Sequence, residues 1–207
     1  MQLLIDRLGK RFNREWIFKD FSLELQAGQS CTFVGPNGSG KSTLLQVISG
    51  VIPLTEGKIN YRLNNQTIEE DKWYKQLVIA APYLELIEEF TLTELLDFHE
   101  GFKPFKIGIT KSEILERVEL DTARQKAIKY FSSGMKQRLK LALAFYSDVP
   151  MVMLDEPTSN LDAKWSAWYR DEVQRLSPAQ VLLICSNVPA EYDFCDKIVN
   201  VSDFKPQ

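Results

Sequence analysis

The sequence has few of the residues that build disulfide frameworks and transition-metal sites. It contains three cysteines, Cys31, Cys185 and Cys195, and a single histidine, His99. The cysteines are odd in number and lack metal-ligand spacing, so we expect buried, reduced thiols of a cytosolic protein. An isolated histidine on a helix is most often a partly exposed surface group, and we assign His99 no function.

Long apolar runs and an excess of basic charge are also missing. The longest apolar runs, such as 181–185, are far shorter than the ~20 residues that a membrane-spanning helix needs. The N-terminus has no basic region followed by an apolar stretch, so no secretory signal is expected. With 25 basic and 28 acidic residues, the net charge of −3 gives no support to a broad nucleic-acid-binding face. A chain of 207 residues suits one domain with a sizeable core.

One glycine-rich segment carries the strongest signal in the chain. It matches the phosphate-binding loop G-x-x-x-x-G-K-[ST] at every fixed position. Its residues are Gly35, Pro36, Asn37, Gly38, Ser39, Gly40, Lys41, Ser42 and Thr43. In such a loop backbone N–H groups turn toward the phosphates, Lys41 reaches the β and γ oxygens, and the Ser42 hydroxyl ligates Mg²⁺. A strand-like run before the loop and a helical pattern after it complete the context, so the sequence predicts binding of a nucleoside triphosphate.

Two carboxylates follow a buried strand further along the chain. Residues 151–154 are apolar and lead directly into Asp155 and Glu156. In an open parallel sheet the residues at the carboxyl end of a strand face the ligand crevice. Asp155 could hold Mg²⁺ through water, and Glu156 could act as general base on an attacking water. Alone, the pair fits a strand followed by a polar turn equally well.

Short strand-like runs alternate with helical patterns along the chain. They fall at residues 3–6, 21–25, 31–34, 58–63, 77–81, 151–154, 181–185 and 198–201. The alternation predicts an α/β domain with a mostly parallel core sheet, and the period-two runs 21–25 and 58–63 predict a small antiparallel element. Between residues 82 and 131 the pattern changes to helices. Thr91 and Thr110 are each followed three residues later by Glu, which predicts two helices with capping boxes. Residues 101–105 are the only breaker region of that helical stretch.

A polar turn opens another helix at residues 131–138, Phe-Ser-Ser-Gly-Met-Lys-Gln-Arg. Its N–H groups and hydroxyl lie at a positive helix end and form a second anion site. The residues of that site are Ser132, Ser133, Gly134 and Met135. Here the sequence resembles the ABC ATPase family, whose signature is Leu-Ser-Gly-Gly-Gln or, in a common variant, Leu-Ser-Gly-Gly-Met-Lys-Gln-Arg. Phe131 and Ser133 replace the leucine and the first glycine. The Cβ of Ser133 would cost on the order of 1 kcal/mol if its backbone needed positive φ.

The resemblance covers nearly the whole chain and implies a single ABC-type P-loop NTPase domain, 1–207. It implies a RecA-like core with a β-layer at 1–82 and 132–207, and a helical subdomain at about 83–131. Residues 157–162, which end at Asp162, resemble the family's D-loop. Phe12 lies where the family places an aromatic that stacks on adenine, although it could equally pack on the small β-layer, and Trp16 is the alternative stacker.

The resemblance also implies how the protein acts. Two such domains, two copies of this chain or this chain with a related one, would sandwich two ATP molecules head to tail. Each ATP, with its Mg²⁺, would lie between the phosphate loop of one protomer and the signature turn of the other, and would be hydrolysed to ADP and phosphate. The partner that crosses the membrane would be a separate permease chain, with this subunit peripheral on the cytoplasmic face, and no nucleic acid is expected.

Two further positions, outside the signature, depart from the family pattern. Tyr83 stands where members carry a glutamine that contacts Mg²⁺ and the attacking water, and a phenol is a poorer metal ligand than an amide oxygen. Asn187 stands where members carry a histidine that contacts the γ-phosphate. An amide can donate a hydrogen bond to phosphate but carries no positive charge, so we expect slow but nonzero hydrolysis.

Two other functions fit the phosphate loop alone. ABC-type ATPases that act as ATP-gated clamps on ribosomes or DNA usually carry a second domain with a basic linker, or long coiled coils, and this chain has neither. A P-loop GTPase or kinase would leave the signature segment unexplained, and no Asn-Lys-x-Asp base-reading motif is present.

The surface expected to receive a helix of the membrane partner is the cleft between the core and the helical subdomain. Apolar residues follow Tyr83 there, and the alternative is that they form the subdomain's own core. They are Leu84, Leu86, Ile87, Phe90 and Leu92.

Overall fold

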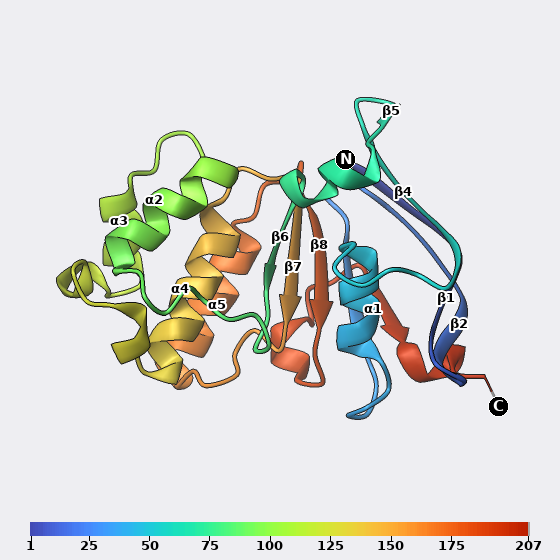
Figure 1. Ribbon diagram of the computed structural model, residues 1–207. Helices are drawn as coiled ribbons and strands as arrows, with labels where there is room; N and C mark the ends of the chain where they lie inside the picture. Colours follow the sequence, from blue (N-terminus) through green and yellow to red (C-terminus); the bar gives the residue numbers. More distant parts are fainter. Residues whose placement is uncertain (207) are drawn as a thin grey trace.

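Five parallel strands form the central sheet of the protein in the computed structural model, which describes residues 1–206 (Figure 1). Their order across the sheet is β6-β7-β8-β3-β9. The strands are β3 (Ser30–Val34), β6 (Leu77–Ala80), β7 (Met151–Asp155), β8 (Val181–Cys185) and β9 (Lys197–Asn200). All residues of β7 and β8 are buried, as expected for parallel strands that are covered on both faces. The predicted mostly parallel core sheet is confirmed.

A second, antiparallel sheet packs beside the first with the strand order β2-β1-β4-β5. Its strands are β1 (Gln2–Phe12), β2 (Glu15–Gln26), β4 (Glu56–Leu63) and β5 (Gln66–Thr67). The expected antiparallel element is present, but β1 and β2 are far longer than the strands predicted from the apolar runs 3–6 and 21–25. Register shifts at Arg7 and Asp20, both with positive φ, interrupt the alternation, so the sequence pattern fades while the pairing continues.

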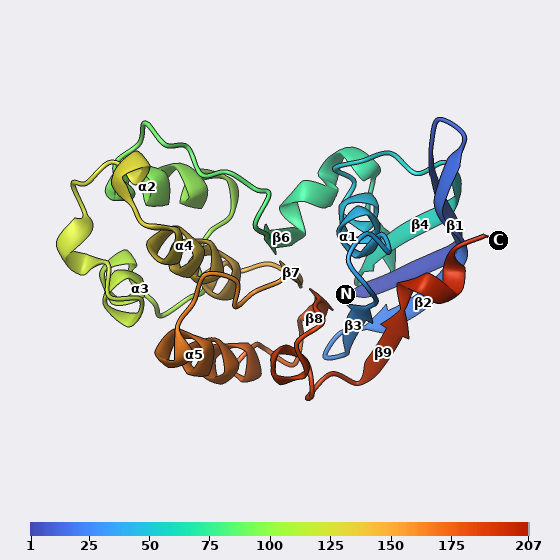
Figure 2. The ribbon, with the colours of Figure 1, turned by 90° about the horizontal axis from the view of Figure 1, so that it is seen from below.

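Helix α1 (Lys41–Ile48) lies between the two sheets (Figures 1 and 2). Its buried side chains Leu44, Leu45 and Ile48 join one hydrophobic core with residues of both sheets. Burial of this helix therefore fixes the loop that precedes it, residues 35–40, against the parallel sheet.

The other helices lie on the side of the parallel sheet away from α1 and share one hydrophobic core with that sheet (Figures 1 and 2). They are α2 (Leu92–Phe102), α3 (Lys111–Arg117), α4 (Ser133–Tyr146) and α5 (Ala163–Gln174), with short 3₁₀ turns between them. Both predicted capping boxes are present, at Thr91 with Glu94 and at Thr110 with Glu113. The last six residues of α4, 141–146, are all buried, because this helix lies between the sheet and the neighbouring helices.

The sequence misplaced one boundary. Helix α2 runs through Gly101 and ends at Phe102, so the expected breaker region starts only at Lys103, where the backbone is extended. No helix within residues 1–206 is long and apolar enough to cross a membrane.

Candidate nucleotide-binding site

The phosphate-loop segment connects β3 to α1 through three glycines with positive φ. The values are +142° at Gly35, +80° at Gly38 and +102° at Gly40. At Gly40 the requirement is also steric, because an added Cβ would lie 2.5 Å from Cγ2 of Ile17. The backbone therefore makes the tight turn expected of a phosphate cradle at the N-terminus of α1.

Lys41 folds back over this loop. Its Nζ donates hydrogen bonds to the carbonyl oxygens of Gly35 at 2.7 Å and Pro36 at 3.3 Å. The side chain is only 6% exposed, so the ammonium group is held at the loop. The buried Ser39 hydroxyl of the same loop has no hydrogen-bond partner within the described residues. The loop thus offers a cation and a free hydroxyl in addition to its backbone N–H groups.

Asp155, at the carboxyl end of β7, lies beside Ser42. The carboxyl group is 2% exposed, and its Oδ2 has no hydrogen-bond partner among residues 1–206. The pKa of Asp155 is raised to about 6, chiefly by burial and also by the charge of the nearby Glu156, while a hydrogen bond with Ser42 acts in the opposite direction. An unpartnered carboxylate oxygen beside a hydroxyl is the hard-oxygen donor set that suits Mg²⁺, so these two residues fit the expected cation.

Glu156 follows Asp155 and lines the open cavity in front of the phosphate loop. That cavity has a volume of about 260 Å³ and is lined by residues 37, 38 and 40–43 together with Ile17 and Glu156. Glu156 is exposed and has a φ of +44°, and its N–H donates to the Cys185 carbonyl at 2.9 Å. Positive φ is strained for a glutamate, and here the bend directs the residue after Asp155 to the cavity.

Tyr83 and Asn187, the residues outside the signature that depart from the family pattern, both lie near this site. Asn187 follows β8, and its Oδ1 accepts a hydrogen bond from the Gly35 N–H at 3.2 Å. Tyr83 follows β6 and is 39% exposed. Burial and the charge of Asp155 raise the pKa of Tyr83, while a hydrogen bond with Gln46 lowers it. The phenol is therefore neutral, and it lies close enough to Asp155 for the charge of that carboxyl group to affect it.

The aromatic residues proposed to stack on adenine lie on the β1–β2 hairpin. Phe12 is 45% exposed, with Lys10 Nζ 4.7 Å from its ring centre. The Trp16 ring has Arg11 at 5.2 Å and Lys19 at 4.9 Å. Because two cations already contact Trp16, Phe12 is the freer of the two rings. Ile17, which the sequence did not single out, is the hairpin residue that lines the cavity.

The signature segment forms the second helix N-terminus. Ser132 caps α4, and its hydroxyl accepts a hydrogen bond from the Met135 N–H at 3.2 Å. Ser133 is the first residue of α4 and does not have positive φ, so the conformational cost considered for its Cβ does not arise. In Figure 1 this end of α4 and the phosphate loop lie at the same lower edge, on opposite sides of β6–β8, whose arrows point to that edge. No signature residue lines the cavity of the phosphate loop.

This arrangement agrees with the comparison with known proteins. Residues 18–159 match the family model described as ABC transporter. The chain belongs to this family. It is 28% identical over 200 residues to the uncharacterized ABC transporter ATP-binding protein YdbJ of Bacillus subtilis, covering 95% of this chain and 65% of that protein. It is 28% identical over 209 residues to the ATP-binding cassette sub-family A member 2 of Rattus norvegicus, covering 97% of this chain and 8% of that protein.

The fold is that of an ABC-type nucleotide-binding domain. A solved dimeric structure of an ATP-binding cassette, described as a post-hydrolysis state bound to ADP and Pi, superposes with a TM-score of 0.80. The sequences are 20% identical, and the match covers 98% of this chain and 95% of the other. This likeness shows the fold of an ATP-binding cassette, in agreement with the family match.

Two residues of this ABC-type domain hold the segment after Glu156: Gln137, which belongs to the signature segment, and Glu191, which the sequence did not single out. Gln137 of α4 donates through Nε2 to the Pro157 carbonyl at 2.7 Å. Glu191, which is 3% exposed, accepts hydrogen bonds through Oε1 from both the N–H and the hydroxyl of Thr158. The sequence shows a glutamate four residues after Asn187, but nothing in it indicates that this residue is buried or which residue it contacts.

Asp162 ends the same segment as the N-cap of α5. Its Oδ1 accepts a hydrogen bond from the Trp165 N–H at 3.0 Å. This capping contact gives Asp162 a structural role in the single chain, and its contribution to nucleotide binding stays a prediction.

Proposed function

We propose that this chain is the ATP-binding and ATP-hydrolysing subunit of an ABC transporter, and that it works as one half of a head-to-tail pair. The observation that carries the proposal is the presence of two helix N-termini, at α1 and at α4, at one edge of the molecule, where each would favour an anion. They lie on opposite sides of β6–β8, so one small anion does not engage both within a single chain. A second copy, or a related domain, turned head to tail would bring them together on each nucleotide.

Hydrolysis would use residues of the phosphate loop together with residues at and just after the ends of β7 and β8, each in a separate role. The N–H groups of the loop and Lys41 would bind the β and γ phosphates, which requires Lys41 to leave the carbonyl oxygens of Gly35 and Pro36. Ser42 and Asp155 would hold Mg²⁺, which neutralises phosphate charge when bound. Glu156 would accept the proton of the attacking water, and Asn187 would donate to the γ-phosphate from its amide.

Hydrolysis is proposed to be slow. Asn187 contributes a neutral donor where a charged or more acidic donor would stabilise the transition state better. Tyr83 brings a neutral phenol, rather than an amide oxygen, to the side of Asp155. Each substitution weakens a contact to the reacting groups, whereas the binding elements of the phosphate loop are complete.

The membrane partner is proposed to dock in the groove between the parallel sheet and the helices. A cavity of about 340 Å³ opens there, and Leu84 and Leu86 are among its lining residues. Of the other residues considered for this surface, Leu92 is fully buried in the helical core and Phe90 packs against that core. The groove thus uses part of the predicted apolar set, and this placement supports a subunit peripheral on the cytoplasmic face of a membrane. A clamp on ribosomes or DNA has no comparable support.

Copurification and turnover test this proposal together. The tagged chain, isolated from its native host in mild detergent, should carry a polytopic membrane protein, and the complex should release phosphate from Mg·ATP. Glu156→Gln should stop the release and leave ATP bound, whereas Asp171→Asn, at an exposed carboxylate of α5 outside both the site and the groove, should change nothing. Copurifying rRNA or DNA without a membrane protein would instead favour the clamp.

A further inference from the structure

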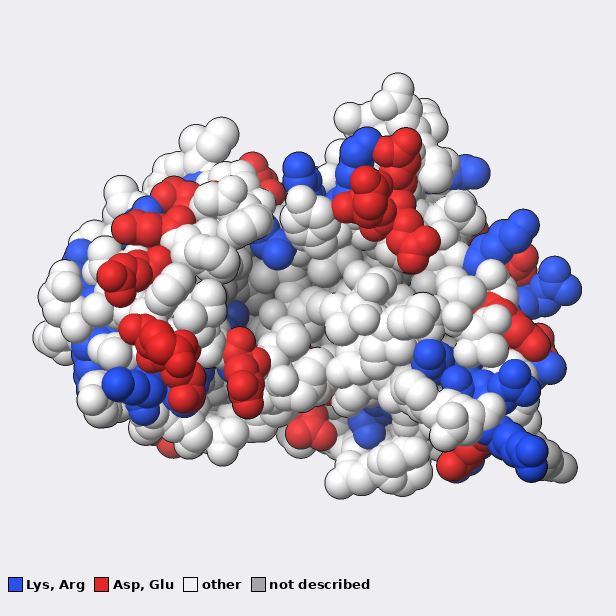
Figure 3. Space-filling view, viewed as in Figure 1, with Lys and Arg blue, Asp and Glu red and all other residues white. Residues whose placement is uncertain are grey.

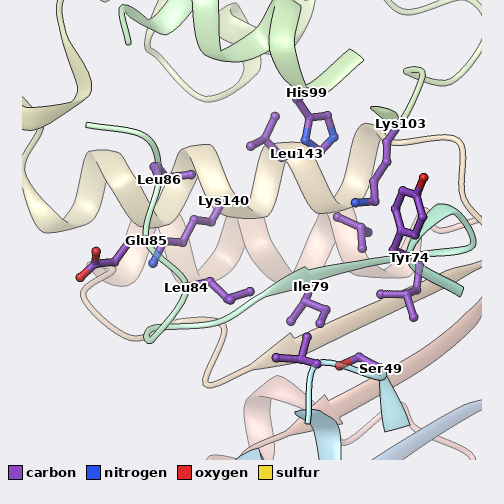
Figure 4. Close-up of a pocket in the computed structure, with 13 residues that line it drawn as sticks. Ser49, Tyr74, Ile79, Leu84, Glu85, Leu86, His99, Lys103, Lys140 and Leu143 are labelled. Carbon is purple, nitrogen blue, oxygen red and sulfur yellow. The ribbon is translucent and has the colours of Figure 1, made fainter. Parts of the chain in front are cut away.

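An unpaired lysine lies in the groove between the helices and the core (Figure 4). Lys103 follows the last residue of α2, and its ammonium nitrogen is directed into the cavity, across from Tyr74. Among residues 1–206 no acidic side chain forms an ion pair with Lys103, and burial lowers the pKa of Lys103 with no opposing contribution from a carboxylate. Burying an ammonium group without a counterion costs free energy, so an acidic group of a ligand would be stabilised beside Lys103.

The second lysine of the groove differs from Lys103 in this respect. Lys140 Nζ donates to the carbonyl oxygens of Ala81 at 3.0 Å and Pro82 at 3.3 Å. Its hydrogen bonds hold the start of the segment that carries Tyr83. Lys103 is therefore the cation of the groove that is free to meet a ligand.

The walls around Lys103 are apolar. Ile79, Leu84, Leu86 and Leu143 line the cavity. A neighbouring cavity of about 370 Å³ shares Lys103 and extends along α2 to Phe98 and Phe102, which are 45% and 55% exposed. Together the two cavities form an elongated apolar groove, which matches the apolar stripe of an amphipathic helix better than it matches a compact ligand.

Acidic side chains gather on both sides of this hollow (Figure 3). The exposed carboxylates of residues 85, 88 and 89 lie in the segment that forms one wall. The exposed carboxylates of residues 69–71 lie in and beside the 3₁₀ turn Glu70–Lys75, which carries Tyr74 on the other wall. Glu88 is paired with Lys136 and Glu69 with Lys72. The other carboxylates of this set give the groove an acidic rim around a central cation, and its complement has basic ends around a central acid.

We propose that the groove selects an amphipathic helix of the membrane partner that has basic residues at its ends and one acidic residue on its apolar face, paired with Lys103. Cytoplasmic loops of membrane proteins carry an excess of Lys and Arg, which suits the acidic rim. The acidic residue then fixes the register of the helix in the groove. This inference rests on the proposed transporter function, because that function supplies the partner.

Three synthetic peptides of about four helical turns test the inference. Each has leucines at i, i+3, i+4 and i+7, lysines at both ends, a fluorescent label, and Glu, Gln or Lys at the centre of the apolar face. Fluorescence anisotropy with the whole chain should show that the Glu peptide binds on the order of tenfold more tightly than the Gln peptide. Lys103→Gln should remove this preference, and Lys103→Glu should shift it to the Lys peptide.

Lys58→Gln is the matched control, because Lys58 is an exposed lysine of β4 outside the groove. It should keep the preference for the Glu peptide, and thermal unfolding should show that the variants of Lys103 are folded. Equal affinity of the wild-type chain for the Glu and Gln peptides, or no binding of any peptide, would overturn the inference. ATP turnover measured without peptide separates the two proposals. If the chain hydrolyses ATP but shows no preference for the Glu peptide, only this inference fails. If it prefers the Glu peptide but does not hydrolyse ATP, only the proposed activity fails.

Discussion

The side chain of Asn187 joins the end of β8 to the phosphate loop. Its Oδ1 accepts a hydrogen bond from the Gly35 N–H at 3.2 Å, and its Nδ2 donates to Asn37 Oδ1 at 3.5 Å. The amide is therefore held at the place from which it can reach a γ-phosphate on the loop. What it lacks is a positive charge, and this limits transition-state stabilisation rather than binding.

Asn187→His should accelerate ATP hydrolysis. An imidazole keeps a donor toward the γ-phosphate and can carry positive charge, and single donors of this kind change turnover by on the order of a hundredfold. Phosphate release at saturating Mg·ATP should rise while nucleotide affinity changes little. Asn187→Ala is the control and should be slower than the wild type. Turnover of Asn187→His at or below the wild-type rate would contradict the explanation.

Two glycines of the phosphate loop provide a matched pair for its backbone geometry. Gly38→Ala and Gly40→Ala both place a Cβ at positive φ, but only the Cβ at Gly40 meets Ile17, at 2.5 Å, whereas that at Gly38 meets nothing within 4 Å. Gly40→Ala should thus lose about 1–3 kcal/mol more stability than Gly38→Ala, because overpacking adds to backbone strain. Urea unfolding and ATP binding by calorimetry measure both effects. Equal losses in the two variants would show that the contact with Ile17 is unimportant.

Glu191 should support the segment that follows Glu156. Glu191→Ala leaves the N–H and hydroxyl of Thr158 without their acceptor, which should cost about 1–3 kcal/mol in the free energy of unfolding and should lower turnover. Glu191→Gln keeps an acceptor oxygen, so its losses should be smaller. A double-mutant cycle with Thr158→Val should give a coupling energy, and strictly additive effects would argue against the contact.

His99 should make the protein sensitive to acid. Burial and, to a smaller extent, the charge of Lys103 lower the pKa of His99 from 6.5 to about 4. Between these values the unfolded chain binds a proton that the folded chain does not, so stability should fall as pH drops from 6.5 to 4, by up to about 3 kcal/mol. His99→Gln should flatten this part of the profile in urea unfolding. An unchanged slope would assign the acid sensitivity to other groups.

His99 also shows where its own prediction fell short. The expectation of a partly exposed side chain is met, but His99 is more than a surface group: Nε2 lies 2.7 Å from Ser147 Oγ, and the ring stacks on Phe105 with 5.6 Å between ring centres. These contacts join α2 to Ser147, which follows α4, and to Phe105 in the loop after α2. Helical spacing alone does not report such pairings between elements.

The parts of the fold that the sequence predicted are those set by local chemistry. The capping boxes at Thr91 and Thr110, the apolar strands and the glycine-rich turn each depend on neighbouring residues. The unpartnered oxygen of Asp155 and the hydrogen bonds from Gln137 and to Glu191 depend on which elements meet in space. The sequence identifies Asp155, Gln137 and Glu191 as polar residues, but it does not identify the groups that each of them contacts.

The central claim is that each ATP is held between the phosphate loop of one chain and the signature turn of another. Two variants in a Glu156→Gln background test it by light scattering with Mg·ATP: Lys41→Ala, which lacks the phosphate-binding cation, and Ser133→Asp, whose acid suits the first turn of α4 but repels phosphate. The Glu156→Gln parent should form dimers of twice the 23.8 kDa chain mass. Each variant alone should stay monomeric, and an equal mixture should form dimers through its one intact composite site. A parent that stays monomeric with ATP bound, or a mixture that stays monomeric while the parent dimerises, would contradict the claim.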